Sequence, residues 1–379
     1  MENLLKDLPP RSFLYNLPPI GIRTIQVESM TSYVSRLINA HNLNSGVFFS
    51  KIIYPKMGKV DVPRDGIIPK KSCTFNNYHQ KSKELVSVLS DLTTINNLEM
   101  HTLLDYSNFL ANYEVRSNKF WCPFCYQDSN DNNIPVYDKL LWVFNDVELC
   151  LEHNCRLICC CPTCKTNQFH ISRNNIMGYC FKCGSWLGYS KSNSTENIPT
   201  EYFHWQEWTI KNIGDLLSLT KIERRETDRI WASYKDRIKE YISRVIDNYL
   251  ITSDELFKLA KVPKRAKYDW EKGKRRASLS SLLKLCYVTS TPLKKFLLMD
   301  LELEKDLKPL PNFIYSNTLH KTQRKYDIDE LRQEILRIAK EQVNPPPSLS
   351  QLSKSLGYKK TETLRAKLPE ETDIIINNY

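Results

Sequence analysis

The chain has 379 residues, of which 54 are lysine or arginine and 43 are aspartate or glutamate, so its net charge is +11. This moderate basic surplus favours a polyanionic partner such as nucleic acid. With 41% hydrophobic and 26% charged residues, the composition is that of an ordinary globular protein, and the length predicts two or three domains. The sequence has no phosphate-binding glycine loop and no hydrolase or metalloprotease signature, which argues against a nucleotide-driven enzyme or a hydrolase.

The first part of the chain is predicted to be helical after a proline-marked, extended lead-in over residues 1–25. A helix is expected over 29–42, because apolar residues recur there at helical spacing. Helical patterns return at 84–89 and 100–113, beyond a loop that proline and glycine interrupt. No run of 18 apolar residues and no signal-peptide segment occurs, so we expect no membrane association and a reducing compartment.

Ten of the twelve cysteines lie within about sixty residues, and eight ligand-type residues there form four pairs with two-residue spacing. Two such pairs supply the closed tetrahedron of thiolate and imidazole that a structural Zn²⁺ prefers. We therefore predict two structural zinc ions and no open, catalytic metal position. The predicted ligands are Cys122, Cys125, Cys150 and His153 for the first ion, and Cys161, Cys164, Cys180 and Cys183 for the second.

The spacing leaves the pairing of these ligands open. The sequential pairing encloses 24 residues in the first site and 15 in the second, and a crossed pairing is the alternative. Strands are expected at 134–137 and 140–144. Disulfides are the rival interpretation of the cysteines, but a chain of this length can form a sufficient hydrophobic core without covalent cross-links. The remaining cysteines, Cys73, Cys155, Cys159, Cys160 and Cys286, are expected to be small buried apolar residues. Cys155, Cys159 and Cys160 could instead shift the ligand register with Cys161, but the Cys-Pro-x-Cys form favours Cys161 and Cys164.

Residues 190–200 are predicted to form a polar linker. The chain beyond it is predicted to be largely helical, with helices at 210–219 and 226–250. A module resembling a helix-turn-helix follows, with helices at 252–260, 264–271, 279–288 and 292–298. Eight basic and two acidic residues lie between Lys261 and Arg276. On a recognition helix, such residues would face the major groove or its phosphates. The candidates for DNA contact are Lys264, Arg265, Lys267, Lys272, Lys274, Arg275 and Arg276.

A second, smaller module resembling a helix-turn-helix is predicted beyond the prolines at 345–347. Its helices are expected at 348–356, where Gly357 provides the stop, and at 361–367. By itself this second module is weak evidence for DNA binding, and a solvated helix face is the alternative interpretation of the basic cluster at 264–276. Its candidates for DNA contact are Lys359, Lys360 and Arg365.

The order of these motifs resembles the TniQ/TnsD family of transposon target-selection proteins. The resemblance covers about residues 14–189, and the C-terminal modules also look like those of the TnsD branch. It is carried by Glu28-Ser29-x-x-Ser32-Tyr33-x-x-Arg36-Leu37, Trp121-Cys-Pro-x-Cys125, Cys150-x-x-His153, Cys161-Pro-x-Cys164 and Gly178-x-Cys-x-x-Cys-Gly184.

The resemblance implies a non-catalytic adaptor that links a Cascade-type RNA-guided effector on target DNA to the AAA+ ATPase regulator of the transposon. The alternative within the family is a TnsD-like protein that binds a fixed attachment site in DNA and recruits the same ATPase. A zinc-scaffolded nuclease is the interpretation outside the family. The resemblance also implies a prokaryotic cytoplasm and allows a homodimer.

We therefore expect a mainly α-helical protein with small β zinc ribbons. The predicted domains are an N-terminal TniQ-type helical domain (1–117), a tandem zinc-ribbon region (118–189), a helical connector (200–250) and two helix-turn-helix-like modules (251–300 and 325–379).

Overall fold

The computed structural model describes residues 11–59, 63, 66–110, 114–189, 198–272, 276–300, 303, 306–311, 332–333, 335–336, 349, 353 and 361–378. The chain divides into two compact units, Met1–Pro311 and Asn312–Tyr379. The described residues are mostly helical, with one two-stranded sheet. None of their helices is both long enough and apolar enough to cross a bilayer.

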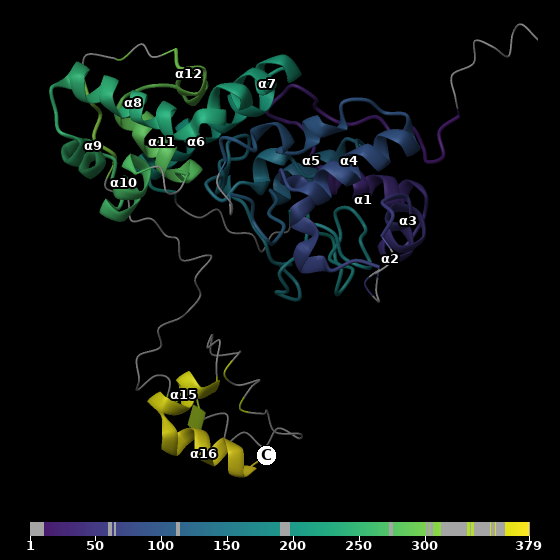
Figure 1. The fold of residues 1–379 in the computed structure, drawn as a ribbon. Coiled ribbons are helices and arrows are strands. Elements are labelled where there is room, and N and C mark those ends of the chain that lie inside the picture. Colours follow the sequence, from purple (N-terminus) through teal and green to yellow (C-terminus); the bar gives the residue numbers. More distant parts are fainter. Residues whose placement is uncertain are drawn as a thin grey trace, which may run out of the picture. The chain divides into compact units, whose positions relative to one another are not determined.

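The N-terminal part of the larger unit is built around helix α1 (Met30–Ala40), drawn in purple and blue in Figure 1. Ser29 caps this helix by accepting a hydrogen bond from the Ser32 N–H, which is the chemistry that favours serine at such a position. The buried face of α1 packs into one apolar core with α4 (Gln80–Thr93) and with Phe48, Phe49 and Phe75. The short helices α2 (Ser45–Val47) and α3 (Tyr54–Lys56) flank a π-helix at Phe48–Ile53, and a 3-10 helix spans Pro69–Asn76.

The cysteine-rich region contributes helix α5 (Pro123–Asp131) and a hairpin of β1 (Leu149–Cys150) and β2 (Cys155–Arg156). The two strands are antiparallel, with Leu149 opposite Arg156 and Cys150 opposite Cys155. Short 3-10 helices lie at Leu98–His101, Leu104–Tyr106 and Leu140–Val143. The strands expected at 134–137 and 140–144 are therefore not formed: 134–137 is irregular and 140–143 is helical.

The rest of the larger unit is an array of helices, drawn in green in Figure 1. In chain order they are α6 (Thr200–Ser218), α7 (Lys221–Ile230), α8 (Tyr234–Tyr249), α9 (Ser253–Leu259), α10 (Lys264–Glu271), α11 (Leu279–Val288) and α12 (Leu293–Leu298). Helices α9 to α12 occupy the positions expected from the sequence. The single helix expected at 226–250 is instead two helices, separated by a 3-10 turn at Trp231–Ser233.

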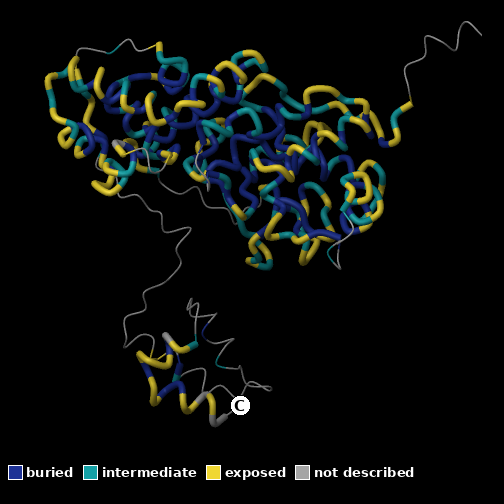
Figure 2. Tube along the Cα trace, viewed as in Figure 1, coloured by how far each residue is buried: buried dark blue, intermediate teal, exposed yellow. Residues whose placement is uncertain are grey.

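Buried contacts join the helical array to the N-terminal part, and buried residues run through both in Figure 2. The Tyr106 hydroxyl donates to the Leu216 carbonyl at 2.6 Å. The fully buried Arg224 donates to the Leu217 carbonyl at 2.6 Å and lies over the Tyr106 ring. Phe109 packs edge-on against Trp231, whose indole N–H donates to the Leu297 carbonyl at 2.8 Å. The described residues of the larger unit therefore share interior contacts across the predicted domain boundaries.

The smaller unit contributes two described helices, α15 (Thr361–Lys367) and α16 (Pro369–Asn378). Helix α15 coincides with the helix expected at 361–367, and α16 was not anticipated. Leu364, Leu368 and Thr372 are buried between them. The helix expected at 348–356 lies almost entirely outside the described residues.

A buried carboxyl group at the junction predicts a pH-dependent stability. Glu114 accepts a hydrogen bond from the Leu279 N–H at 2.9 Å, at the start of α11. Burial, with a smaller contribution from nearby Asp146, raises the pKa of Glu114 to about 8 against the opposing effect of that hydrogen bond. Because this pKa is raised on folding, the contribution of Glu114 to stability is full below the ordinary carboxyl pKa and is lost as pH rises through about 8.

We expect the Glu114→Gln variant to gain stability relative to the wild type as pH rises from about 5 to 9. The amide keeps the acceptor oxygen and cannot ionise, so the difference should reach a few kcal/mol, at about 1.4 kcal/mol per pKa unit. Urea unfolding of both proteins at several pH values measures it, and effects of pH on other groups cancel in the comparison. If the free energies of unfolding of the two proteins changed with pH in parallel, the raised pKa of Glu114 would be contradicted.

Candidate metal centres and the helix that carries them

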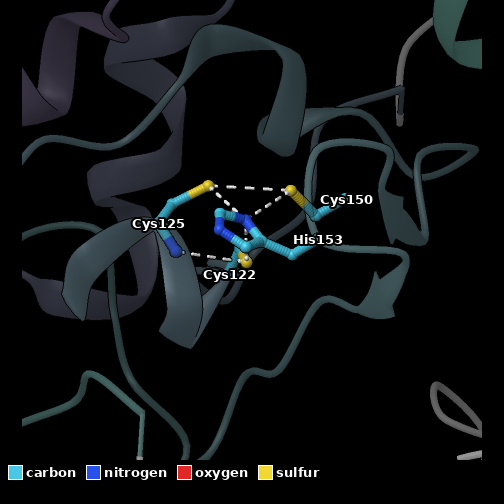
Figure 3. A group of neighbouring side chains, drawn as sticks. All are labelled: Cys122, Cys125, Cys150 and His153. Carbon is cyan, nitrogen blue, oxygen red and sulfur yellow. Dashed lines mark hydrogen bonds between the residues drawn. The ribbon is translucent and has the colours of Figure 1, made fainter. Parts of the chain in front are cut away.

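The first metal centre is assembled from a helix start and a hairpin. Cys122 is the N-cap of α5, Cys125 lies in its first turn, Cys150 lies on β1, and His153 lies in the hairpin turn. Figure 3 shows the three thiols and the imidazole pointing toward one point. The Cys125 sulfur is 3.6 Å from the Cys150 sulfur, and His153 Nδ1 is 3.4–3.6 Å from all three sulfurs.

The second centre contains only cysteines and comes from two loops. Cys161 Sγ lies 3.7 Å from Cys183 Sγ, and Cys164 Sγ lies 3.6 Å from Cys180 Sγ. In both centres the four ligand atoms lie within 4.8 Å of one another. The structure thus brings the ligands together in the sequential pairing, not the crossed one.

The geometry of both clusters fits zinc. Sulfur ligands at about 2.3 Å and a nitrogen ligand at about 2.0–2.1 Å, arranged as a tetrahedron, lie about 3.5–3.8 Å from one another. The observed separations of 3.4–3.7 Å match this. Each donor set is complete with four protein ligands, which is typical of a structural site. These residues are therefore compatible with two structural zinc ions.

Groups around the ligands fix their orientation. His153 Nε2 lies 2.7 Å from Asp128 Oδ2, an arrangement that presents Nδ1 to a metal. The Lys139 ammonium lies 3.7 Å from the Cys125 sulfur and 2.8 Å from Glu152. In the second centre the Gln168 amide donates to the Cys180 sulfur at 3.4 Å. Such contacts stabilise thiolates beside a metal.

Helix α1 is joined to the first centre through its N-terminal serines. Ser32 donates to the Glu28 carboxylate at 2.8 Å and accepts from the Asp138 N–H at 2.9 Å. The Ser29 N–H donates to the Asp138 carbonyl at 2.9 Å. Asp138 in turn accepts the hydroxyl of Tyr126 on α5 and pairs with Lys119 at 3.0 Å. The Glu-Ser-x-x-Ser motif therefore connects α1 to the segment beside the first metal centre.

The same helix holds the loop of the second centre from its other end. Asn39 donates to the Asn175 carbonyl at 2.7 Å and accepts from the Met177 N–H at 2.9 Å. Asn175 donates back to the Ser35 hydroxyl at 2.5 Å. Next in this loop, Gly178 has φ +84°, and a Cβ there would meet the Trp186 ring at 2.3 Å. Both clusters are thus attached to one buried helix.

A buried ion pair links the residue before the N-cap of α1 to the helix itself. Arg36 lies 2.6 Å from Glu28, and both side chains are almost fully buried. Burial raises the pKa of Glu28 to about 7, although Arg36 and the Ser32 hydroxyl act to lower it. His101 Nδ1 lies 2.7 Å from the Glu28 carbonyl, and burial lowers the pKa of His101 to about 4. His101 is therefore a neutral core residue.

The residues proposed for DNA contact are not all available on the surface. Lys264, Arg265 and Lys272 are exposed on or beside α10. Lys267 pairs with Asp254 at 2.5 Å, and Arg276 donates to the carbonyls of Ser107 and Leu110. Arg365 on α15 pairs with Asp373 at 3.0 Å. Lys274, Arg275, Lys359 and Lys360 lie outside the described residues.

The cysteines outside the two centres differ from the expectation. Cys286 is buried, as predicted, but Cys73, Cys155, Cys159 and Cys160 are only half-buried. Cys155 faces Cys150 across the hairpin, and its sulfur lies 3.5 Å from that of Cys122. Sequence reasoning missed this neighbour, because only the hairpin register brings it to the centre.

Comparison with known protein families identifies a match over part of the chain. Residues 19–157 match the sequence model of the TniQ family, a range that includes α1, α5 and all four ligands of the first centre. No curated protein matches the chain. The matched range contains the Glu-Ser-x-x-Ser motif and the metal ligands that it connects. Residues 19–157 are thus a TniQ domain, the domain of a family of transposition target-selection proteins.

Proposed function

We propose that the protein is a non-catalytic adaptor that links a Cascade-type RNA-guided effector on target DNA to the AAA+ ATPase regulator of the transposon. The TniQ domain over residues 19–157 carries this proposal. Both metal centres hold four protein ligands, so a role as scaffold suits them better than catalysis. The adaptor acts in the prokaryotic cytoplasm, where reducing conditions keep cysteine thiols free for zinc.

The partners that basic residues on and beside α10 already have favour guided over direct target recognition. Of the basic residues on this eight-residue helix, Lys267 already pairs with Asp254. Arg276, just beyond it, is held by two backbone carbonyls. Engaged cations cannot contribute fully to phosphate or base contacts. An effector that carries its own guide needs no such contacts from the adaptor.

Co-purification tests the proposal. The tagged full chain is expressed with candidate Cascade-type proteins and guide RNA, and zinc is counted in the purified product. We expect the effector to co-purify with about two zinc ions per chain, as two closed sites require. Light scattering on the product gives the number of copies, and a homodimer is one form that the adaptor could take. Two zinc ions without any effector would contradict the adaptor and favour direct DNA binding.

The second candidate is a TnsD-like protein that binds a fixed attachment site. The exposed Lys264 and Arg265 at the start of α10 favour it. If this candidate is correct, the wild type should bind one DNA sequence tightly, with an affinity that falls steeply as salt increases. Lys264→Ala/Arg265→Ala should then abolish this tight binding. If the adaptor is correct, the same variant should support guide-directed insertion at the wild-type level.

A further inference from the structure

A pocket in the N-terminal part of the larger unit has no role in either metal centre. Its volume is about 220 Å³, and three lysines, Lys59, Lys71 and Lys81, line it. Apolar side chains complete the wall, among them Tyr54, Ile67 and Phe75. We refer to it as the lysine pocket.

The lysine pocket lies in a basic stretch of the sequence. Residues 51–84 include eight basic and three acidic residues. Lys59 pairs with Glu84 at 2.7 Å. Lys70, Lys71, Lys81 and Lys83 are exposed, and no described residue forms an ion pair with them. Of these four, Lys71 and Lys81 line the pocket, and ammonium groups without an ion-pair partner attract a polyanion.

The apolar part of the pocket is built from rigid elements. The Phe75 and Phe49 rings are stacked with centroids 5.4 Å apart, and Tyr54 packs against Phe49 at 5.7 Å. Gly66, beside Ile67, has φ +73°, and a Cβ there would lie 2.1 Å from the Gly46 carbonyl oxygen. This close approach fixes the wall segment against α2. The pocket therefore exists before any ligand binds.

We propose that the lysine pocket binds single-stranded nucleic acid, with one base in the apolar pocket and the flanking phosphates on Lys71 and Lys81. Its volume is below the roughly 300–1,000 Å³ of pockets that enclose drug-sized ligands, so it suits one planar base. Single-strand binding combines cations along the backbone with apolar or aromatic contacts to unstacked bases. A duplex keeps its bases stacked and would leave the pocket empty. The inference does not depend on which effector the protein serves.

Fluorescence anisotropy on the full chain tests the site. The probes are oligothymidylate and oligouridylate of about 20 nucleotides, long enough to span such a site, and an abasic oligomer with the same phosphates. We expect Lys71→Ala/Lys81→Ala to weaken binding of both base-containing probes about tenfold and to reduce the salt slope by about 1.4, or 0.7 per lost phosphate contact. The abasic oligomer should bind the wild type more weakly than either base-containing probe does.

The matched control is Lys235→Ala/Lys239→Ala, which removes the same charge from exposed positions on α8 and should bind like the wild type. Equal losses in the two double variants would overturn the proposal, since charge alone would then explain binding. So would equal affinity for the abasic and base-containing probes. A loss confined to Lys264→Ala/Arg265→Ala would place the binding on α10 and also overturn it.

Discussion

Replacing Cys122 by serine is expected to unfold the first metal centre. A structural zinc contributes its binding free energy to folding, on the order of 10 kcal/mol in finger peptides. Cys122 does more than supply a metal ligand, because its sulfur also accepts a hydrogen bond from the Cys125 N–H at 3.4 Å and caps α5. Without the ion, the two remaining thiols and the imidazole have no common partner. The variant should lose about one of two zinc ions and melt at a much lower temperature.

Two further variants make this test specific. Cys161→Ser should remove the zinc of the second centre and leave the first, because the two ligand sets share no residue. Cys286→Ser is the matched control: Cys286 is buried in α11 and belongs to neither set, so it should keep both ions. Elemental analysis and thermal melting measure all three variants. An unchanged melting temperature and zinc content in Cys122→Ser would refute the structural role.

The metal ligands could be predicted from the sequence because each pair is local. A two-residue spacing places two ligands on one turn wherever that turn lies in the fold. The choice between sequential and crossed pairing depends on how α5 meets the hairpin, and this is a tertiary feature. The same limit explains Cys155, which only the register Cys150–Cys155 brings beside Cys122.

Helices with clear end signals were predicted well. Ser29 and Ser278 accept hydrogen bonds from the first turns of α1 and α11, and Thr252 forms a capping box with Glu255 at α9. By contrast, the apolar pattern at 100–113 arises because Met100, Leu103, Tyr106 and Phe109 are all buried in short 3-10 helices and turns. Periodicity alone cannot separate such a segment from a helix.

The basic residues illustrate a second limit of sequence reasoning. The count of charges along the chain identified 261–276 as the main basic cluster. In the fold, however, Lys267 pairs with Asp254 and Arg276 donates to the Ser107 carbonyl. The lysines around the pocket are spread over 51–84 among prolines and apolar residues. Only folding gathers them at one place. Charge density along a sequence is therefore a poor guide to charge density on the surface.

Replacing Arg36 by alanine is expected to destabilise the protein by about 3–5 kcal/mol, the usual cost of leaving a buried charge without its partner. Arg36 is the ion-pair partner of Glu28 at 2.6 Å, and the Glu28 side chain is fully buried. In the variant the Glu28 carboxylate keeps a backbone hydrogen bond at Ile20 and the Ser32 hydroxyl, which also holds the segment beside the first metal centre. Urea unfolding measures the loss. Wild-type stability in Arg36→Ala would contradict the role of the pair.

A double variant separates the lost pair from lost packing. Glu28→Gln/Arg36→Met removes both charges, keeps a long side chain at position 36 and leaves an acceptor for Ser32, so it should recover most of the stability. The loss in Arg36→Ala should also shrink at low pH. Burial raises the pKa of Glu28 to about 7 even with Arg36 present, and removing the cation raises it further. Below the ordinary carboxyl pKa, Glu28 is protonated in both the folded and the unfolded state and needs no counter-ion. A loss that is constant from acidic to neutral pH would instead mean that Arg36 stabilises α1 through packing alone.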